Sequence, residues 1–418
     1  MPGGGARAVI PLLRRPLASA AGNPVEFRNP PPLALYVHVP WCVQKCPYCD
    51  FNSHALPAGS SIGQRQTAIP ESDYLTALIA DLESALPLVW GRRVDSVFIG
   101  GGTPSLLSGE GVDQFLAAVR SRLPLLPNAE ITLEANPGTV EAGKFAAFRA
   151  AGVNRLSLGI QSFNPRHLTA LGRIHDDREA RLAIGIAASH FDNFNLDLMY
   201  GLPGQTLAEA LADVDAALAC APPHLSCYQL TIEANTAFAV RPPALPDPDT
   251  CADMQDAIET KLAAAGYRHY EISAFARAGQ ECRHNLNYWQ FGDYLGIGAG
   301  AHSKLSFAHR IVRQVRHREP RLYMERAAAM DCIASSTEVP RADLPFEFML
   351  NALRLKEGFP LAHFLERTGL PLSAIAAALD KAETAGLVTR DLASVVPTER
   401  GFDFLNDLQS MFLPANAT

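Results

Sequence analysis

Six short apolar runs recur between about residues 33 and 230, and stretches with helical periodicity separate them. The runs read LALYVHV, VDSVFIGG, AEITLEANP, VNRLSLGIQS, FNLDLMYGLP and HLSCYQLTIE. The intervening stretches, such as SDYLTALIADLESALPLV and GEGVDQFLAAVRSRL, repeat apolar residues at three- and four-residue spacing, which is typical of amphipathic helices. This alternation predicts a parallel sheet. Six units are too few for a complete eight-fold barrel, so we expect an α/β fold with a partial (β/α)6 TIM-type barrel over residues 33–240.

The predicted strands end in polar or glycine-rich residues. These are His38, the turn from Gly100 to Thr103, Glu134, Gln161 and Asp197. In parallel sheets of this kind, active sites gather at the carboxyl ends of the strands. Asp197 lies inside the apolar run FNLDLMY, where an unpaired buried carboxylate would cost several kcal/mol. We therefore expect a functional site at this edge, although a solvated strand end would also explain Glu134 and Gln161.

The remaining segments suggest two further units. A proline-rich break at Arg241–Thr250 precedes a helix, CADMQDAIETKLAAAGY, and a segment that reads as rich in turns, HNLNYWQFGDYLGIGAGAHS. Residues 241–335 are therefore predicted to extend the barrel. Residues 336–418 read as three helices and a short strand pair, a small winged-helix-like α+β domain. Its basic and acidic residues balance, which favours packing or protein contact over DNA binding.

Composition and charge exclude several classes of protein. There are 36 Lys and Arg against 43 Asp and Glu, a net charge of −7, which argues against a nucleic-acid binder with a broad basic surface. No apolar run is long enough for a transmembrane helix. Residues 1–32 are expected to form a flexible leader, with a targeting peptide as the alternative for the first 25. Cysteines outside the triplet discussed next are single, which fits the reducing cytoplasm.

Cys42, Cys46 and Cys49 form a C-x3-C-x2-C triplet in HVPWCVQKCPYCDF. Thiolates suit zinc or an iron–sulfur cluster. A closed zinc site would need a fourth ligand, for which His38 and His54 are the nearby candidates. In a [4Fe-4S] cluster, three thiolates leave one iron open to a substrate or cofactor, and this spacing favours the cluster.

The triplet at the end of a first barrel strand resembles the radical S-adenosylmethionine (SAM) superfamily. The strings LALYVHVPWCVQKCPYCDFNSH, FIGGGTPSLL, LEANPG, LGIQSF and LDLMYGLPGQT resemble the branch that contains oxygen-independent coproporphyrinogen III oxidases and HemW-type haem chaperones. The resemblance covers nearly everything from residue 33 onward. It implies a radical SAM barrel in which the open iron chelates SAM, and reduction of the cluster cleaves a C–S bond to give a 5′-deoxyadenosyl radical.

The resemblance also implies a set of SAM contacts. GGGTP is neither a dinucleotide fingerprint nor a P-loop, and a plain tight turn would also explain it; in the family this turn holds the SAM amino group. Arg173 matches the partner of the SAM carboxylate. The full set is Tyr36, Tyr48, Gly101, Gly102, Thr103, Glu134, Gln161, Arg173, Asp197, Thr231 and His302.

A second motif, CRHNLNYW, contains His284 followed by Tyr288 and Trp289. A lone His is more often a structural hydrogen-bonding group. However, imidazole near Tyr and Trp suits a flat, apolar, iron-bearing ligand such as haem, and H-N-x-x-Y-W matches the haem-associated motif of the HemW-type chaperones. The resemblance therefore implies His284 as a haem ligand.

Phe51 favours a chaperone over an oxidase. The oxidases carry a further cysteine at the position of Phe51 and a longer N-terminal extension. We therefore predict a haem chaperone that delivers haem to apo-haemoproteins, among them membrane-bound respiratory enzymes, with little or no oxidase activity. The alternatives are radical decarboxylation of coproporphyrinogen III, and a zinc or cluster protein whose barrel is only a scaffold. The sequence leaves open whether the chain forms a homodimer.

Overall fold

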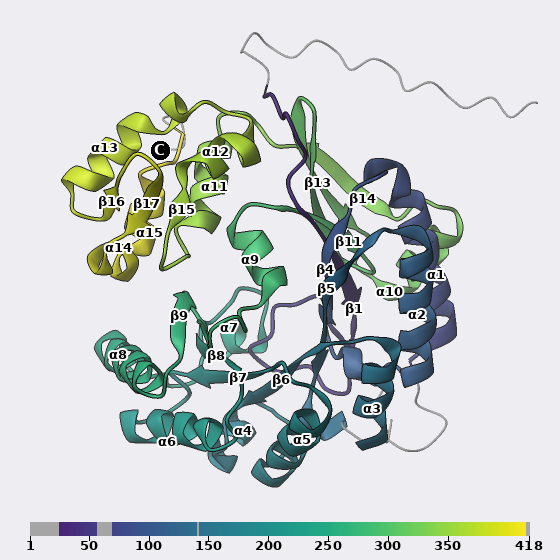
Figure 1. Cartoon of the computed structure of the whole chain (residues 1–418). Coiled ribbons are helices and arrows are strands. Elements are labelled where there is room, and N and C mark those ends of the chain that lie inside the picture. Colours follow the sequence, from purple (N-terminus) through teal and green to yellow (C-terminus); the bar gives the residue numbers. More distant parts are fainter. Residues whose placement is uncertain (1–24, 57–68, 140–141, 415–418) are drawn as a thin grey trace, which may run out of the picture.

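The computed structural model describes residues 25–56, 69–139 and 142–414. The six predicted strands form a continuous parallel array in the strand order in which they occur in the chain. Figure 1 shows this array as a curved, open wall with helices on its outer side. The predicted partial barrel is confirmed. Its strands are β1 (Leu33–Val39), β4 (Val94–Gly101), β5 (Leu125–Ala135), β6 (Arg155–Gln161), β7 (Phe194–Tyr200) and β8 (His224–Gln229).

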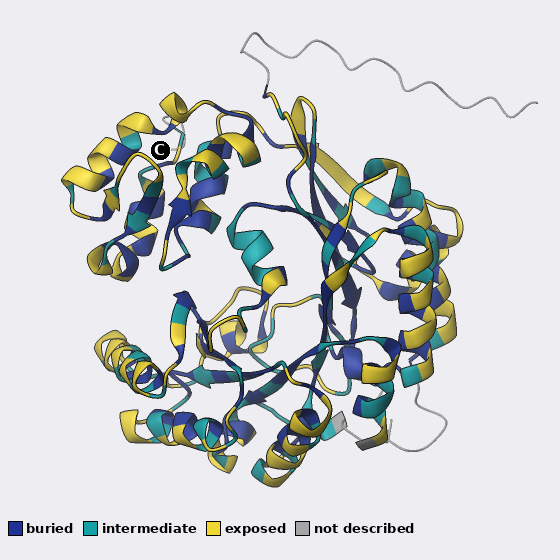
Figure 2. Ribbon diagram, in the orientation of Figure 1, coloured by how far each residue is buried: buried dark blue, intermediate teal, exposed yellow. Residues whose placement is uncertain are grey.

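The helices between these strands bury one apolar face each. In the helix that follows β1, the buried positions recur every three to four residues, from Tyr74 through Leu78 to Leu82, as the sequence pattern predicts. Together with the outer face of the strands they form one large apolar core, visible as the dark blue inner layer in Figure 2. Among the described residues, no helix is long and apolar enough to cross a membrane. The helices between the strands are α1 (Glu71–Ala85), α2 (Gly109–Arg122), α3 (Ala142–Ala151), α4 (Pro165–Ala170), α5 (Asp177–His190) and α6 (Leu207–Leu218); α7 (Ala237–Val240) and α8 (Pro248–Ala264) follow β8.

The sheet continues beyond the barrel on both sides. Its full order is β14-β13-β12-β11-β1-β4-β5-β6-β7-β8-β10-β9, with β11 parallel to β1 and the outer strands antiparallel. A helix of nine residues, between β13 and β14 in the chain, packs against α1, where the Tyr323 hydroxyl donates to Asp81 (2.9 Å). These outer elements are β9 (Arg268–Glu271), β10 (Ala274–Ala276), β11 (Asp293–Ile297), β12 (His302–Phe307), β13 (Arg310–Arg316), α10 (Pro320–Ala328) and β14 (Ile333–Glu338).

The segment HNLNYWQFGDYLGIGAGAHS was expected to be rich in turns, but most of it is helix and strand. The structure has a helix there, α9 (Arg283–Trp289), followed by β11. The carboxylate of Glu130 on β5 accepts hydrogen bonds from the backbone N–H groups of Arg283 (3.1 Å) and His284 (3.0 Å). This negative charge stabilises the start of the helix, and it comes from a strand more than 150 positions away, so local sequence does not reveal it.

The C-terminal part has its own apolar cluster. It contains five helices and a three-stranded sheet in the order β15-β17-β16. Val25 is buried in the same cluster, and the Glu26 N–H donates to the carbonyl of Gly369, so the end of the predicted leader packs here; residues 1–24 lie outside the described ranges. The elements are α11 (Leu344–Ala352), β15 (Phe359–Pro360), α12 (Leu361–Thr368), α13 (Ala376–Thr384), β16 (Val388–Arg390), β17 (Ser394–Pro397), α14 (Glu399–Asp403) and α15 (Leu405–Ser410).

Candidate functional site

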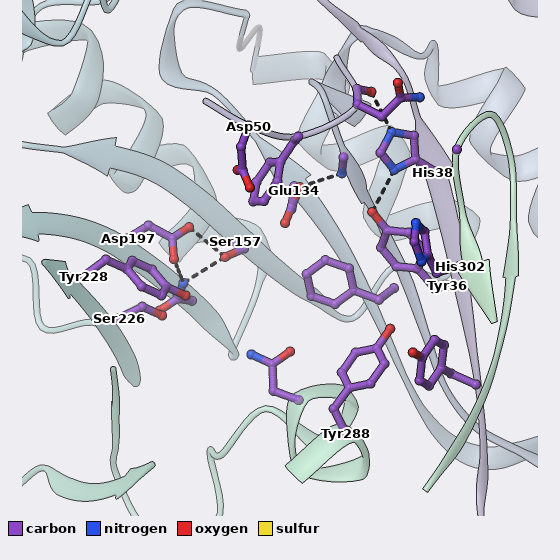
Figure 3. Close-up of a pocket in the computed structure, with 18 of the residues that line it drawn as sticks. Tyr36, His38, Asp50, Glu134, Ser157, Asp197, Ser226, Tyr228, Tyr288 and His302 are labelled. Carbon is purple, nitrogen blue, oxygen red and sulfur yellow. Dashed lines mark hydrogen bonds between the residues drawn. The ribbon is translucent and has the colours of Figure 1, made fainter. Parts of the chain in front are cut away.

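Two adjoining cavities lie at the carboxyl ends and along the inner face of the parallel strands. The smaller, of ≈300 Å³, is lined by the three triplet cysteines and is called the cysteine cavity here. The larger, of ≈640 Å³, is called the barrel cavity, and Figure 3 shows its walls. Both volumes lie in the range of small-molecule sites. The cavities share wall residues, namely Phe51, Gly101, Glu134, Ser157, Asp197 and Tyr228.

The cysteine loop is held in place by short strands and a lysine. It begins at β2 (Trp41–Cys42), which pairs with β3 (His54–Ala55). Between them, Lys45 donates to the backbone carbonyls of Phe51 and Ser53, both at 3.2 Å, and the Cys49 N–H donates to the Cys46 carbonyl. The loop therefore holds its three thiols on one wall of the cavity before any ligand binds.

The glycine turn after β4 packs directly on this loop. The Gly102 N–H donates to the Val39 carbonyl and the Thr103 N–H to the Trp41 carbonyl, each at 2.7 Å. A Cβ at position 102 would lie 2.4 Å from the Trp41 carbonyl oxygen. Gly101 has φ +115°, a conformation that favours glycine. The glycines are therefore required by the close approach of the turn to the cysteine loop, which a plain surface turn would not need.

Arg173 joins the triplet to the neighbouring strands. Its guanidinium donates to Asn136 Oδ1 (2.5 Å) and to the Gly159 carbonyl (2.7 Å), and it lies 3.6 Å from the Cys46 sulfur. Its Nε is buried without a partner in the described residues. These contacts fix a cation on the wall of the cysteine cavity, beside the thiols.

Glu134 and Asp197 face each other across the junction of the two cavities. Burial, with the charge of Asp197 as the second cause, raises the pKa of Glu134 to about 8, although the Gly101 N–H donates to its Oε2 at 3.0 Å. Burial also raises the pKa of Asp197, while Asn195 (2.8 Å) and Ser157 (3.0 Å) donate to its carboxylate. At neutral pH Glu134 is therefore mainly protonated in the ligand-free site, and a bound cation would favour its ionisation.

The structure brings most of the predicted SAM residues together. Thr231 lines neither cavity, and its exposed hydroxyl donates to Glu233. Tyr36 and His302 line only the barrel cavity. The others line the cysteine cavity with the triplet: Tyr48, Gly101, Gly102, Thr103, Glu134, Gln161, Arg173 and Asp197.

His284 lies behind the wall of the barrel cavity. The side chain is 1% exposed, and both ring nitrogens are engaged, Nδ1 with the Ser96 hydroxyl (2.9 Å) and Nε2 with the Tyr288 hydroxyl (3.2 Å). Burial lowers the pKa of His284 to about 3, so its imidazole is neutral at physiological pH. Asn285 and Tyr288 of the same motif do line the cavity.

Apart from Asp197, the polar residues on the inner face of β6, β7 and β8 were not among the candidate site residues predicted from the sequence. Complete TIM barrels fill this face mainly with apolar side chains. Here alternate positions are polar and line the barrel cavity: Arg155, Ser157, Asn195, Asp197, Ser226 and Tyr228. Their period of two within otherwise apolar runs was a signal that the sequence offered.

The donors of the cysteine cavity fit an iron–sulfur cluster. Within the described ranges, no three His, Cys, Asp or Glu side chains lie close enough to hold a single metal ion. The thiolates of a [4Fe-4S] cluster bind different iron atoms, so such ligands need not converge on one point. The three thiols share one cavity wall and leave the remaining wall to polar groups.

Comparison with known proteins gives the family. Residues 36–217 match the model of the radical SAM superfamily, and residues 339–404 match that of the HemN C-terminal domain. The chain is 50% identical to the heme chaperone HemW of Escherichia coli over 385 residues, which cover 92% of this chain and 98% of the relative. The chain belongs to the HemW family of radical SAM proteins. Family membership implies a [4Fe-4S] cluster and SAM.

Two further matches agree with this assignment. The heme chaperone HemW of Haemophilus influenzae is 48% identical over 389 residues, which cover 92% of this chain and 98% of the relative. The solved structure of coproporphyrinogen III oxidase (HemN) from Escherichia coli superposes with a TM-score of 0.76 at 23% identity, covering 92% of this chain and 90% of that one. At 23% identity this match supports the fold, including its C-terminal part, but it does not distinguish an oxidase from a chaperone. The relatives at 50% and 48% identity are both heme chaperones HemW.

Proposed function

We propose that this protein is a haem chaperone that binds a [4Fe-4S] cluster, SAM and haem, and delivers haem to apo-haemoproteins. The observation that carries the proposal is the 50% identity to a heme chaperone HemW over 92% of the chain. All eight cysteines lie in the described residues as free thiols, which fits work in the reducing cytoplasm. Membrane-bound respiratory proteins are among the recipients that we propose.

We assign the cluster to Cys42, Cys46 and Cys49, and SAM to the polar wall beside them. When bound, the cluster supplies an open iron and an electron for SAM. In this arrangement Arg173, beside Cys46, provides a cation for the SAM carboxylate. The backbone of the glycine turn can approach the SAM amine because no Cβ intervenes. Glu134 and Asp197, at the junction with the barrel cavity, provide acceptors for the cationic and hydroxyl groups of SAM.

We assign haem to the barrel cavity. Aromatic side chains of β1, β4, α9 and β11 contribute to its walls: Tyr36, Phe98, Tyr288 and Tyr294. A flat apolar ring can pack against such rings. The shared wall between the cavities would place this ligand next to SAM, which gives SAM and the cluster a direct route to influence haem binding or release.

Phe51 supports the chaperone over the oxidase. It is 60% exposed and lines both cavities. The oxidases that the sequence resembles carry a cysteine at this position, whereas this chain presents no thiol there. The experiment is an anaerobic assay of the cluster-reconstituted protein with coproporphyrinogen III, reductant and SAM, alongside a haem titration. We expect a haem Soret band and no decarboxylation. Turnover to protoporphyrinogen would overturn the chaperone assignment in favour of the oxidase.

His284 is the haem ligand that we propose from the family motif. Ligation through Nε2 requires Tyr288 to give up its hydrogen bond to that nitrogen, because the lone pair cannot serve both. His284→Ala should therefore weaken the Soret band, whereas Tyr288→Phe, which frees Nε2, should tighten haem binding. His302→Ala is the matched control, since His302 lines the cavity directly. If only His302→Ala weakens the band, the ligand assignment to His284 is wrong.

A further inference from the structure

Arg155 at the start of β6 is a buried cation with no fixed partner among the described residues. Its side chain is 2% exposed and lines the barrel cavity. Its Nε has no hydrogen-bond partner, and no carboxylate oxygen in the described part of the chain lies within 4.0 Å of its guanidinium. A buried arginine normally directs its five N–H donors at acceptors, because leaving them unpaired costs free energy. An arginine held in this state calls for an acceptor from outside the chain.

The Asn195 amide, which lines the same cavity as Arg155, already has its full set of partners. The side-chain carbonyl of Asn195 accepts from His224 (2.7 Å) and Ser226 (3.0 Å), and its amide donates to Ser157 and Asp197, both at 2.8 Å. That is the full hydrogen-bonding capacity of an asparagine side chain. Figure 3 shows this chain of contacts from Asp197 through Ser157. Asn195 therefore has no acceptor left for Arg155.

The nearest acidic groups are also committed elsewhere. Glu130 accepts from the first backbone N–H groups of α9 and from the Cys282 thiol at 3.5 Å. Asp197 accepts from Ser157 and Asn195. Burial acts to lower the pKa of Arg155, but the nearby Cys282, Glu130, Tyr270 and Asp197 raise it overall, so the guanidinium stays charged. The charges nearby keep Arg155 cationic, and none of them occupies its donors.

We propose that Arg155 binds a carboxylate of the ligand held in the barrel cavity, and that this carboxylate is a propionate of haem. The identity of the ligand rests on the proposed function. The position of the residue excludes the SAM carboxylate as the partner, because Arg155 lines the barrel cavity only, whereas Arg173 lies beside the thiols in the cysteine cavity. Guanidinium and carboxylate match in geometry and form charge-assisted, often bidentate hydrogen bonds.

This assignment orients the haem in the cavity. Arg155 lies on the inner face of β6, beside the polar residues that β7 and β8 contribute to the same cavity. The Phe and Tyr side chains of the cavity, apart from Phe51 and Tyr228, come from β1, β4, α9 and β11. A propionate on Arg155 therefore directs the acidic edge of the macrocycle toward β6–β8 and leaves its apolar edge for the aromatic side. An apolar porphyrin edge against the polar network would leave Arg155 buried and unpaired.

The test compares haem with its dimethyl ester, which has the same ring and iron but no carboxylate. The cluster-reconstituted full-length protein is titrated with each ligand in the same detergent, and the Soret band gives both affinities. We expect the wild type to bind haem at least tenfold more tightly than the ester. Arg155→Gln should reduce that preference to within about twofold, because the lost charge-assisted hydrogen bonds account for a factor of this size. Arg310→Gln, an exposed arginine outside the cavity, should keep the wild-type ratio.

The outcomes separate this inference from the function on which it rests. Haem binding by the wild type without preference over the ester overturns the role of Arg155 and leaves the chaperone standing. If Arg155→Gln keeps the full preference for haem over the ester, the role of Arg155 is likewise overturned and the chaperone assignment stands. Failure of the wild type to bind haem overturns both. If Arg155→Gln does not fold, Arg155→Lys is tested in its place. Lysine keeps the charge but cannot form two parallel hydrogen bonds to a carboxylate, so the preference for haem over the ester should fall several-fold. An unchanged ratio of the two affinities overturns the inference.

Discussion

Glu134→Gln should remove a large pH dependence of stability. Burial raises the pKa of Glu134 from the usual 4.5 to about 8. The folded protein therefore holds this proton more tightly than the unfolded chain does, so the stabilisation is complete below pH 4.5 and is lost as the pH rises toward 8. The difference of 3.5 pKa units corresponds to about 4 kcal/mol lost at pH 8, of which about 2 kcal/mol is lost between pH 6 and pH 8.

Glutamine keeps the shape and the acceptor for the Gly101 N–H but cannot ionise. We compare the free energy of unfolding of Glu134→Gln with that of the wild type at each pH. The difference, variant minus wild type, should be about 2 kcal/mol larger at pH 8 than at pH 6. Urea unfolding of the cluster-free protein at both pH values, followed by circular dichroism, measures this difference. The control is Glu325→Gln, an exposed carboxylate in a surface ion pair, which removes the same formal charge. Parallel pH profiles for the wild type and Glu134→Gln would refute the burial of an ionisable Glu134.

Two further substitutions test the framework of the site. Gly102→Ala places a Cβ 2.4 Å from the Trp41 carbonyl oxygen, so it should displace the turn and weaken SAM binding at least tenfold in equilibrium dialysis; Gly143→Ala, where the space is open, should leave SAM affinity unchanged. Asp81→Asn removes the charge that pairs with fully buried Arg316 at 3.2 Å, so it should lower the free energy of unfolding by about 3–5 kcal/mol. A loss below about 1 kcal/mol in urea unfolding would contradict that role.

The sequence predicted the parallel array and the cysteine side of the site because both depend on local pattern. The apolar runs became strands β1 and β4–β8, and the carboxyl ends of parallel strands necessarily meet at one edge. Polar groups at strand ends such as Glu134, Gln161 and Asp197 therefore had to lie together, and they share one cavity with the triplet.

Features that depend on distant contacts were not predictable. The helix α9 begins where Glu130, on another strand, accepts its first N–H groups. Residues 310–316 form an inner strand of the antiparallel extension, although their sequence, RIVRQVR, is rich in arginine. Arg316 occurs there because Asp81 of α1 neutralises it inside the protein. A pattern within either segment contains no information about its partner.

Helix α9 explains why the H-N-x-x-Y-W motif combines these residue types. His284 anchors the helix to Ser96 of β4, Asn285 and Tyr288 face the barrel cavity, and the ring of Trp289 lies 4.1 Å from the guanidinium of Arg354 in the C-terminal part. One helix therefore contacts the barrel, the cavity and the C-terminal part. A shift of Tyr288 that releases His284 for haem would change the wall of the cavity and the position of Trp289 together, because both residues lie on consecutive positions of the same short helix.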